Sequence, residues 1–205
     1  MSNRPWFRET EIFAQGLDGY HTYRIPALVT TPRGTMLAFC EGRKYDHSDW
    51  GEIHIVLRRS MDGGASWGAM SVVHSDGEHT IGNPCPIVDR DTGRVWLVYC
   101  WDNDRVFVMH SDDDGVSWAA PREITGDVKP AGWTWYGTGP GHGIQARSGR
   151  LIVPSDHRQG TRQGWPLFRS HVVYTDDHGA TWKAGADIAP WTDECMAVES
   201  EDGRT

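Results

Sequence analysis

The sequence predicts an all-β fold built from repeated four-stranded sheets, and three observations support this. One eight-residue pattern occurs three times, a glycine turn recurs between apolar runs, and no segment shows a convincing helical period. The 11 Trp and 24 Gly among 205 residues suit short strands, tight turns and aromatic packing better than helices. This length is enough for one domain with a sizeable core.

The repeated pattern is [ST]-x-D-x-G-x-[ST]-W, and its copies follow one another at intervals of 51 and 64 residues. They span residues 60–67, 111–118 and 175–182. The aspartate can accept hydrogen bonds from turn amides about two residues further on, and the glycine permits a positive φ. The closing tryptophan can cover the turn. A strand is expected before each copy, at 53–59, 106–110 and 171–174.

A glycine turn forms the second repeat. Its four copies lie at 33–35, 92–94, 148–150 and 202–204. Short apolar runs precede them at 25–29, 86–88, 143–145 and 195–198, and runs at 36–40, 95–100 and 151–153 follow the first three. The turn glycines are spaced by 59, 56 and 54 residues, so each repeat predicts one four-stranded blade of a β-propeller.

The chain is therefore expected to be a single partial propeller domain over residues 1–205. The predicted blades cover roughly 20–75, 80–125 and 137–190, and a fourth begins at 193–205. Propellers close their ring with about 4–8 blades. We therefore expect that the natural polypeptide continues past Thr205, or that the sequence is a partial gene product.

Charge and composition narrow the function. The net charge of −8 argues against a nucleic-acid partner, and it would repel an anionic ligand at long range, so local arginines would have to hold one. The four cysteines form no CxxC pair and are expected to be small core residues. No stretch has transmembrane length or resembles a signal peptide, so no membrane partner and a cytoplasmic location are expected, with secretion or a periplasmic location left open.

Several further motifs occur in order along the chain, the first of them before the first repeat. Tyr23-Arg24-Ile25-Pro26, Glu41-Gly42-Arg43 and Ser48-Asp49-Trp50-Gly51-Glu52 lie in the first unit. Together with the three copies of the repeated pattern, known as the Asp-box or bacterial-neuraminidase repeat, they resemble the sialidase (neuraminidase) family. The resemblance runs from Tyr23 to Glu199. It implies a six-bladed propeller, of which this chain holds about three and a half blades.

The resemblance also implies roles for the first unit. Arg24 would be one of three arginines that grip the sialic acid carboxylate, as a guanidinium does bidentately. Glu41 and Arg43 would support that network and contact the sugar. Asp49 would be the catalytic acid/base. The structural alternatives are a surface arginine, a loop ion pair and a turn-capping aspartate, and Glu52 is the nearest rival to Asp49.

Later motifs supply the remaining candidates. Asn83, in Asn83-Pro84-Cys85-Pro86, would lie near the N-acetyl group of the sugar. Asp156 and His157 stand where side chains of the family meet the glycerol tail, although many relatives carry Tyr there and a lone histidine is more often structural. Glu194, in Asp193-Glu194-Cys195, would be the base that activates a tyrosine nucleophile, with Glu199 as its competitor.

The expected activity is that of an exo-α-sialidase, a retaining glycosidase that removes terminal sialic acid from sialylated glycans. A neutral tyrosine nucleophile avoids repulsion by the substrate's own carboxylate, and neither metal nor cofactor is needed. The counterparts of two carboxylate arginines and the tyrosine have no place in these 205 residues, so the chain alone is expected to be inactive. One alternative is a non-catalytic Asp-box propeller that binds glycans or proteins. Another keeps the fold but changes the reaction, to trans-sialylation or to hydrolysis of a related nonulosonic acid.

Overall fold

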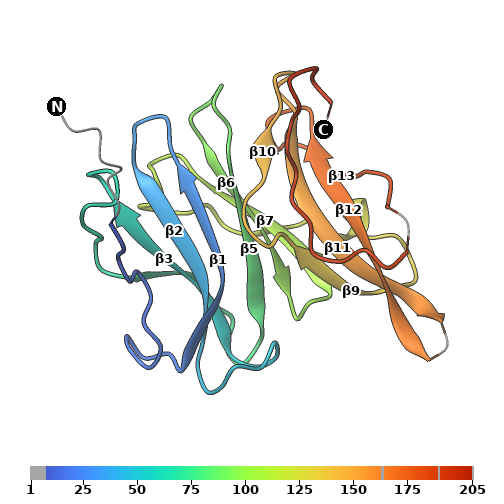
Figure 1. Ribbon diagram of the computed structural model, residues 1–205, viewed down its shortest axis with the longest axis horizontal. Helices are drawn as coiled ribbons and strands as arrows, with labels where there is room; N and C mark the ends of the chain where they lie inside the picture. The colour runs from blue at the N-terminus through green and yellow to red at the C-terminus, as the bar shows by residue number, and fades with distance from the viewer. Residues whose placement is uncertain (1–7, 163, 189, 205) are drawn as a thin grey trace.

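The computed structural model describes residues 8–162, 164–188 and 190–204. It contains three antiparallel sheets that follow one another in chain order along the longest axis of the molecule (Figure 1). The helix in the described residues is the four-residue α1 (Thr125–Val128), and none of them forms a helix able to cross a bilayer. The prediction of an all-β fold with four-stranded repeats is confirmed for the first two sheets.

Each of these two sheets has its strands in sequence order. The first contains β1 (Thr22–Thr30), β2 (Met36–Arg43), β3 (Ile53–Ser60) and β4 (Ser71–His74). The second contains β5 (Ile81–Val88), β6 (Val95–Trp101), β7 (Arg105–Ser111) and β8 (Arg122–Glu123). Strands β2 and β6 are almost entirely buried, as their continuous apolar runs predict.

The third sheet has five strands because two strands occupy the place that one first strand takes in the other sheets. It contains β9 (Trp133–Thr138), β10 (Ile144–Gln145), β11 (Leu151–Arg162), β12 (Trp165–Thr175) and β13 (Lys183–Ala184). Both β9 and β10 pair with β11, and the chain leaves the sheet between them at Gly139-Pro140. Strand β9 was not predicted, and the β11–β12 hairpin is longer than the predicted runs at 151–153 and 171–174.

The Asp-box turns have the expected glycine geometry but a longer hydrogen-bond reach. Gly64, Gly115 and Gly179 have φ values of +84°, +77° and +83°. The carboxylate of Asp62 accepts from the backbone N–H of Ser66 at 2.8 Å and from its hydroxyl at 2.6 Å. The predicted acceptor role is therefore right, but the donor lies four residues on rather than two.

Apolar packing joins neighbouring sheets face to face. One cluster combines Leu37, Phe39 and Leu57 of the first sheet with Val95 and Leu97 of the second. A second cluster combines β5–β7 residues with β9, β11 and β12 residues of the third sheet. The second sheet therefore packs between the first and the third, which is the packing of propeller blades, and the three sheets are called blades 1, 2 and 3 below.

The second and third Asp-boxes form part of these blade contacts. Gly115, in the Asp-box of blade 2, lies on Leu37 and Leu57 of blade 1. Gly179, in the Asp-box of blade 3, lies on the Trp96 ring of blade 2, and the neighbouring His178 Nδ1 lies 2.8 Å from Asp89 Oδ2. The turn repeat therefore links each of these blades to the preceding one.

This contact predicts a difference between two equivalent glycines. In Gly179→Ala, the new Cβ would lie 2.3 Å from the Trp96 ring, whereas in Gly64→Ala the nearest atom is 3.5 Å away. Both variants incur left-handed backbone strain of about 1–2 kcal/mol, and only Gly179→Ala adds overpacking of about 1–3 kcal/mol. Urea unfolding should show Gly179→Ala to be the less stable variant, and equal midpoints would contradict the proposed blade contact.

The last described segment forms a turn without a strand. The predicted run at 195–198 is not a strand, because no neighbouring strand among the described residues pairs with its backbone. The glycine turn after it forms nonetheless: Ser200 N donates to Arg204 O at 2.8 Å and Gly203 N to Ser200 O at 2.9 Å. These bonds match those at Thr31–Thr35 and Ala146–Arg150, so the turn is locally encoded.

Candidate active site

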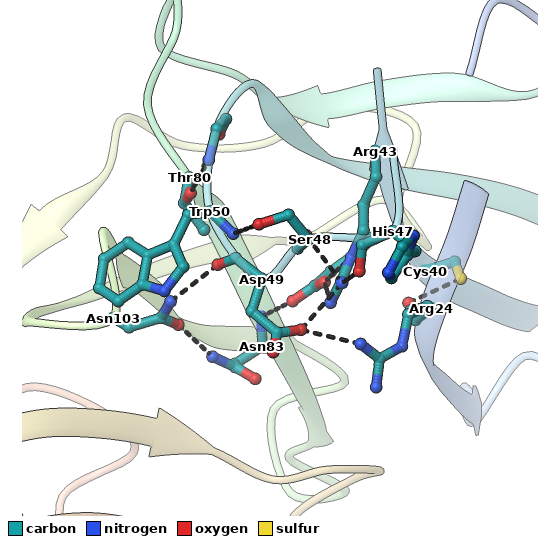
Figure 2. Close-up of polar contacts among 12 residues, drawn as sticks. Arg24, Cys40, Arg43, His47, Ser48, Asp49, Trp50, Thr80, Asn83 and Asn103 are labelled. Atoms are coloured by element: carbon teal, nitrogen blue, oxygen red, sulfur yellow. Dashed lines mark hydrogen bonds and ion pairs between the residues drawn. The ribbon is translucent and has the colours of Figure 1, made fainter. Parts of the chain in front are cut away.

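Asp49 lies between two arginines at the rim of blade 1. Its Oδ1 is 2.8 Å from Arg24 Nη1 and 2.8 Å from Arg43 Nη1 (Figure 2). The Asp49 side chain is 55% exposed and that of Arg24 is 47% exposed, whereas Arg43 is buried. A carboxylate that faces solvent is therefore held by one accessible and one inaccessible guanidinium.

Arg43 and Glu41 form the buried floor beneath this carboxylate. Arg43 donates from Nε and Nη2 to Glu41 Oε2, at 3.0 and 2.6 Å, and both side chains are at most 4% exposed. Glu41 Oε1 accepts the Asn83 backbone N–H at 2.7 Å. Burial raises the pKa of Glu41, and the contacts with Arg43 and Asn83 act in the opposite direction. Gly82 leaves room for the carboxylate, since a Cβ there would lie 2.6 Å from Oε1.

The loop that carries Asp49 is anchored on blade 2. Asn103 Nδ2 donates to the Asp49 carbonyl at 3.0 Å, and Asn103 Oδ1 accepts from Asn83 Nδ2 at 2.9 Å (Figure 2). Thr80 Oγ1 donates to Gly51 O and accepts from Gly51 N, both at 3.0 Å. Asp49 is thus fixed by its backbone as well as its carboxylate, which is the preorganisation that an acid/base catalyst requires.

Two residues before proline have unusual backbone conformations beside the site. Ile25 and Asn83 both have φ near +55°, at the register shifts of β1 and β5. Positive φ is a genuine outlier for a β-branched residue such as Ile25, and such strain clusters at functional sites. One of the resulting bulges begins directly after Arg24, and the other contains Asn83. Both strained positions therefore lie at predicted site residues.

Asp156 lies on β11 with its carboxyl buried over Gly137. The residue is 5% exposed, and a Cβ at Gly137 would lie 2.5 Å from its Oδ1. Burial, together with the negative charges of Asp193 and Glu194, raises the pKa of Asp156 to about 7. Asp156 and Glu194 are therefore electrostatic neighbours, whereas no contact in the described part of the chain joins Glu194 to Asp49.

His157 points to the opposite face of β11, as strand alternation requires, and is fully buried. Its ring stacks on Trp133 with centroids 3.3 Å apart, and its Nδ1 lies 3.1 Å from His171 Nδ1. Burial lowers the pKa of His157 to about 4 and that of His171 to about 3. The structure thus places the His157 ring among blade 3 residues, with no exposed surface for a ligand.

The structure brings together five of the predicted site residues: Arg24, Glu41, Arg43, Asn83 and Asp49. The sequence analysis missed Asn103 and Thr80, which anchor the loop. Asn103 lies in the turn between β6 and β7, where the polar run Asp102-Asn103-Asp104 interrupts two apolar strands. That position would have placed it at the same rim as Asp49.

One further cluster has metal-ligating residue types. In the described part of the chain, Asp89, Asp91 and His178 place one ligand atom each within 4.8 Å of one another. Asp89 already pairs with His178, and Gln145 Nε2 donates to Asp91 Oδ2 at 2.8 Å. The carboxylates of this cluster therefore already have hydrogen-bond partners within the protein. The cluster lies at the contact between blades 2 and 3, apart from the Asp49 site.

The chain is similar to known sequences over nearly its whole length. The family model for a BNR repeat-like domain matches residues 18–204. The sialidase of Micromonospora viridifaciens is 35% identical over 98% of this chain, and mouse sialidase-3 is 34% identical over 95%. The chain spans 34% and 53% of the length of these two relatives.

Solved structures of other proteins share the fold of this chain. The Hadza microbial sialidase Hz136 superimposes with a TM-score of 0.81 at 28% identity, covering 88% of this chain and 40% of its own. A leech intramolecular trans-sialidase also has a TM-score of 0.81, covering 97% of this chain and 49% of its own, but at 16% identity it supports the fold alone. The fold and the family match together show that this chain belongs to the sialidase/BNR-repeat family of β-propellers.

Proposed function

We propose that the protein containing these blades is an exo-α-sialidase that releases terminal sialic acid from sialylated glycans. The observation that carries this proposal is the Asp49 carboxylate, held at 2.8 Å by both Arg24 and Arg43 on a loop fixed from blade 2. The similarity to sialidases over nearly the whole chain supports the same reaction.

The described residues suit distinct roles in this reaction. Arg24 is accessible and permanently charged, so it can exchange its contact with Asp49 for the carboxylate of the substrate. Asp49 would then donate its proton to the leaving glycosidic oxygen and afterwards take a proton from the attacking water. Because the chain carries a net charge of −8, the attraction of an anionic sugar must be local to these arginines.

Glu194 is proposed as the base that draws a proton from a tyrosine nucleophile. Its exposed side chain lies near the buried Asp156, and the pKa of Asp156, raised to about 7, reduces the average negative charge beside Glu194 near neutral pH. The tyrosine and two further arginines would come from outside these 205 residues.

The test is to incubate the intact protein with 3′-sialyllactose and follow the products by NMR. Release of the α-anomer of free sialic acid as the first product is expected, since the proposed mechanism retains configuration. The 205-residue chain alone should show negligible turnover. Binding without release would instead support the non-catalytic alternative, and transfer of the sugar to an acceptor would indicate trans-sialylation.

A further inference from the structure

An exposed tryptophan follows the candidate acid/base directly. Trp50 is 55% exposed, and its backbone is fixed on both sides: Trp50 N donates to Ser48 Oγ at 3.2 Å, and Gly51 is bound by Thr80. Its ring makes an edge contact with Trp135 of β9, with centroids 5.6 Å apart and planes at 76°. Two blades therefore bring together one aromatic surface beside Asp49.

Trp135 is itself held in place from blade 3. The guanidinium of Arg158, its partner across β9 and β11, lies 4.5 Å from the Trp135 ring centroid and 4.5 Å from that of Phe168. The Trp50–Trp135 pair is thus preorganised, and its apolar surface is accessible at Trp50 without any movement of the chain.

The position of the pair indicates which part of a glycan it would meet. Figure 2 shows Arg24 and Trp50 on opposite sides of Asp49. Under the proposed function, Arg24 holds the carboxylate of the sialic acid, and Asp49 protonates the glycosidic oxygen. The floor at Glu41 and Arg43 is closed, so the remainder of the glycan must leave toward the open rim, where Trp50 is exposed.

We propose that Trp50 and Trp135 form the subsite for the leaving-group sugar, a neutral pyranose whose C–H face packs on the indole rings. This inference rests on the proposed function for its assignment to the leaving group. A neutral sugar ring suits the site because the tryptophan pair presents aromatic surface. The nearby charge of Arg158 already lies between the rings of Trp135 and Phe168, so it does not call for an anionic group on the sugar. Trp50 is then a specificity-determining residue that acts on glycan substrates and not on small sialosides.

The test compares two substrates with the intact protein. Trp50→Ala should lower kcat/KM for 3′-sialyllactose by about three- to tenfold, as loss of one aromatic contact implies, and should leave methyl α-sialoside unaffected. Trp50→Phe should restore most of the loss. Trp165→Ala, at a tryptophan on the β11–β12 hairpin that is 72% exposed, is the control and should change the rate with neither substrate.

Equal losses on both substrates would overturn the proposal, because Trp50 would then act on the sialic acid or on Asp49. An unchanged rate with sialyllactose would overturn it too. If the wild-type protein hydrolyses neither substrate, the proposed function fails, and lactose decides the subsite separately. Saturation-transfer NMR should then detect lactose on the wild-type chain and lose it in Trp50→Ala, and no signal with the wild-type chain would reject the subsite.

Discussion

Replacement of Asp49 by Asn is expected to lower kcat/KM for 3′-sialyllactose by about 10²–10⁴-fold, the usual contribution of a positioned general acid. Asn can still accept the hydrogen bond from Arg24, and the backbone contact of residue 49 with Asn103 does not depend on its side chain. The variant therefore removes the transferable proton and the negative charge between the two arginines, while the backbone anchor of the loop remains. Its melting temperature should stay close to that of the wild-type protein.

The choice of substrate shows whether the missing proton causes the loss. An aryl sialoside with a good leaving group needs little protonation, so Asp49→Asn should retain far more of its rate on that substrate. Asp46→Asn is the control: Asp46 is exposed on the same loop and accepts the Ser48 N–H at 2.7 Å, which Asn can also do. A variant at Asp49 with wild-type activity on sialyllactose would remove this residue from the mechanism.

The largest effect on stability is expected for Arg43→Met. Removal of one partner from a buried ion pair costs about 3–5 kcal/mol, because the remaining charge is left without compensation. For a chain of this size, that free energy corresponds to a melting temperature lower by roughly 6–20 °C. Differential scanning calorimetry of the variant measures this shift directly.

Arg24→Met provides a matched comparison, since Arg24 contacts the same Asp49 oxygen from an exposed position. Surface ion pairs contribute about 0–1 kcal/mol, so this variant should melt within a few degrees of the wild-type protein. The double variant Glu41→Gln, Arg43→Met removes both buried charges and should be more stable than Arg43→Met alone. If the two single arginine variants melt together, the buried pair does not stabilise the fold.

The sequence predicted the parts of the fold that short-range chemistry determines. The Asp-box turns and the glycine turns need only a carboxylate, a hydroxyl and a positive-φ glycine within a few residues, so their patterns are visible in the chain. Strand β9 was missed because Gly139-Pro140 separates it from β10, so the first strand of this blade is split in two. The pairing of β9 with β11 is a tertiary contact that no local pattern shows. The run at 195–198 has the apolar pattern of a strand, but a strand also needs a neighbour to pair with. No described strand pairs with this run, so the prediction was wrong there.

For the candidate site, the motifs identified residues by their chemical type. They did not show in which direction each side chain points. Arg24, Asp49 and Arg43 were predicted as separate motifs, and the fold brings them into one contact. Asp156 and His157 are adjacent in sequence, yet alternation along β11 sends them to opposite faces. Whether a position faces solvent or the neighbouring blade depends on register, which the sequence pattern did not determine.

One chain of hydrogen bonds crosses all three blades near the candidate site. Glu41 of blade 1 accepts the Asn83 N–H of blade 2, and the Asn83 carbonyl accepts the hydroxyl of Thr138 in blade 3 at 2.6 Å. Glu41 and Asn83, two of the groups that align the blades, thus also belong to the candidate site. Substitutions at these two residues are therefore expected to disturb blade alignment together with the site, whereas the exposed Trp50 takes no part in this chain of hydrogen bonds.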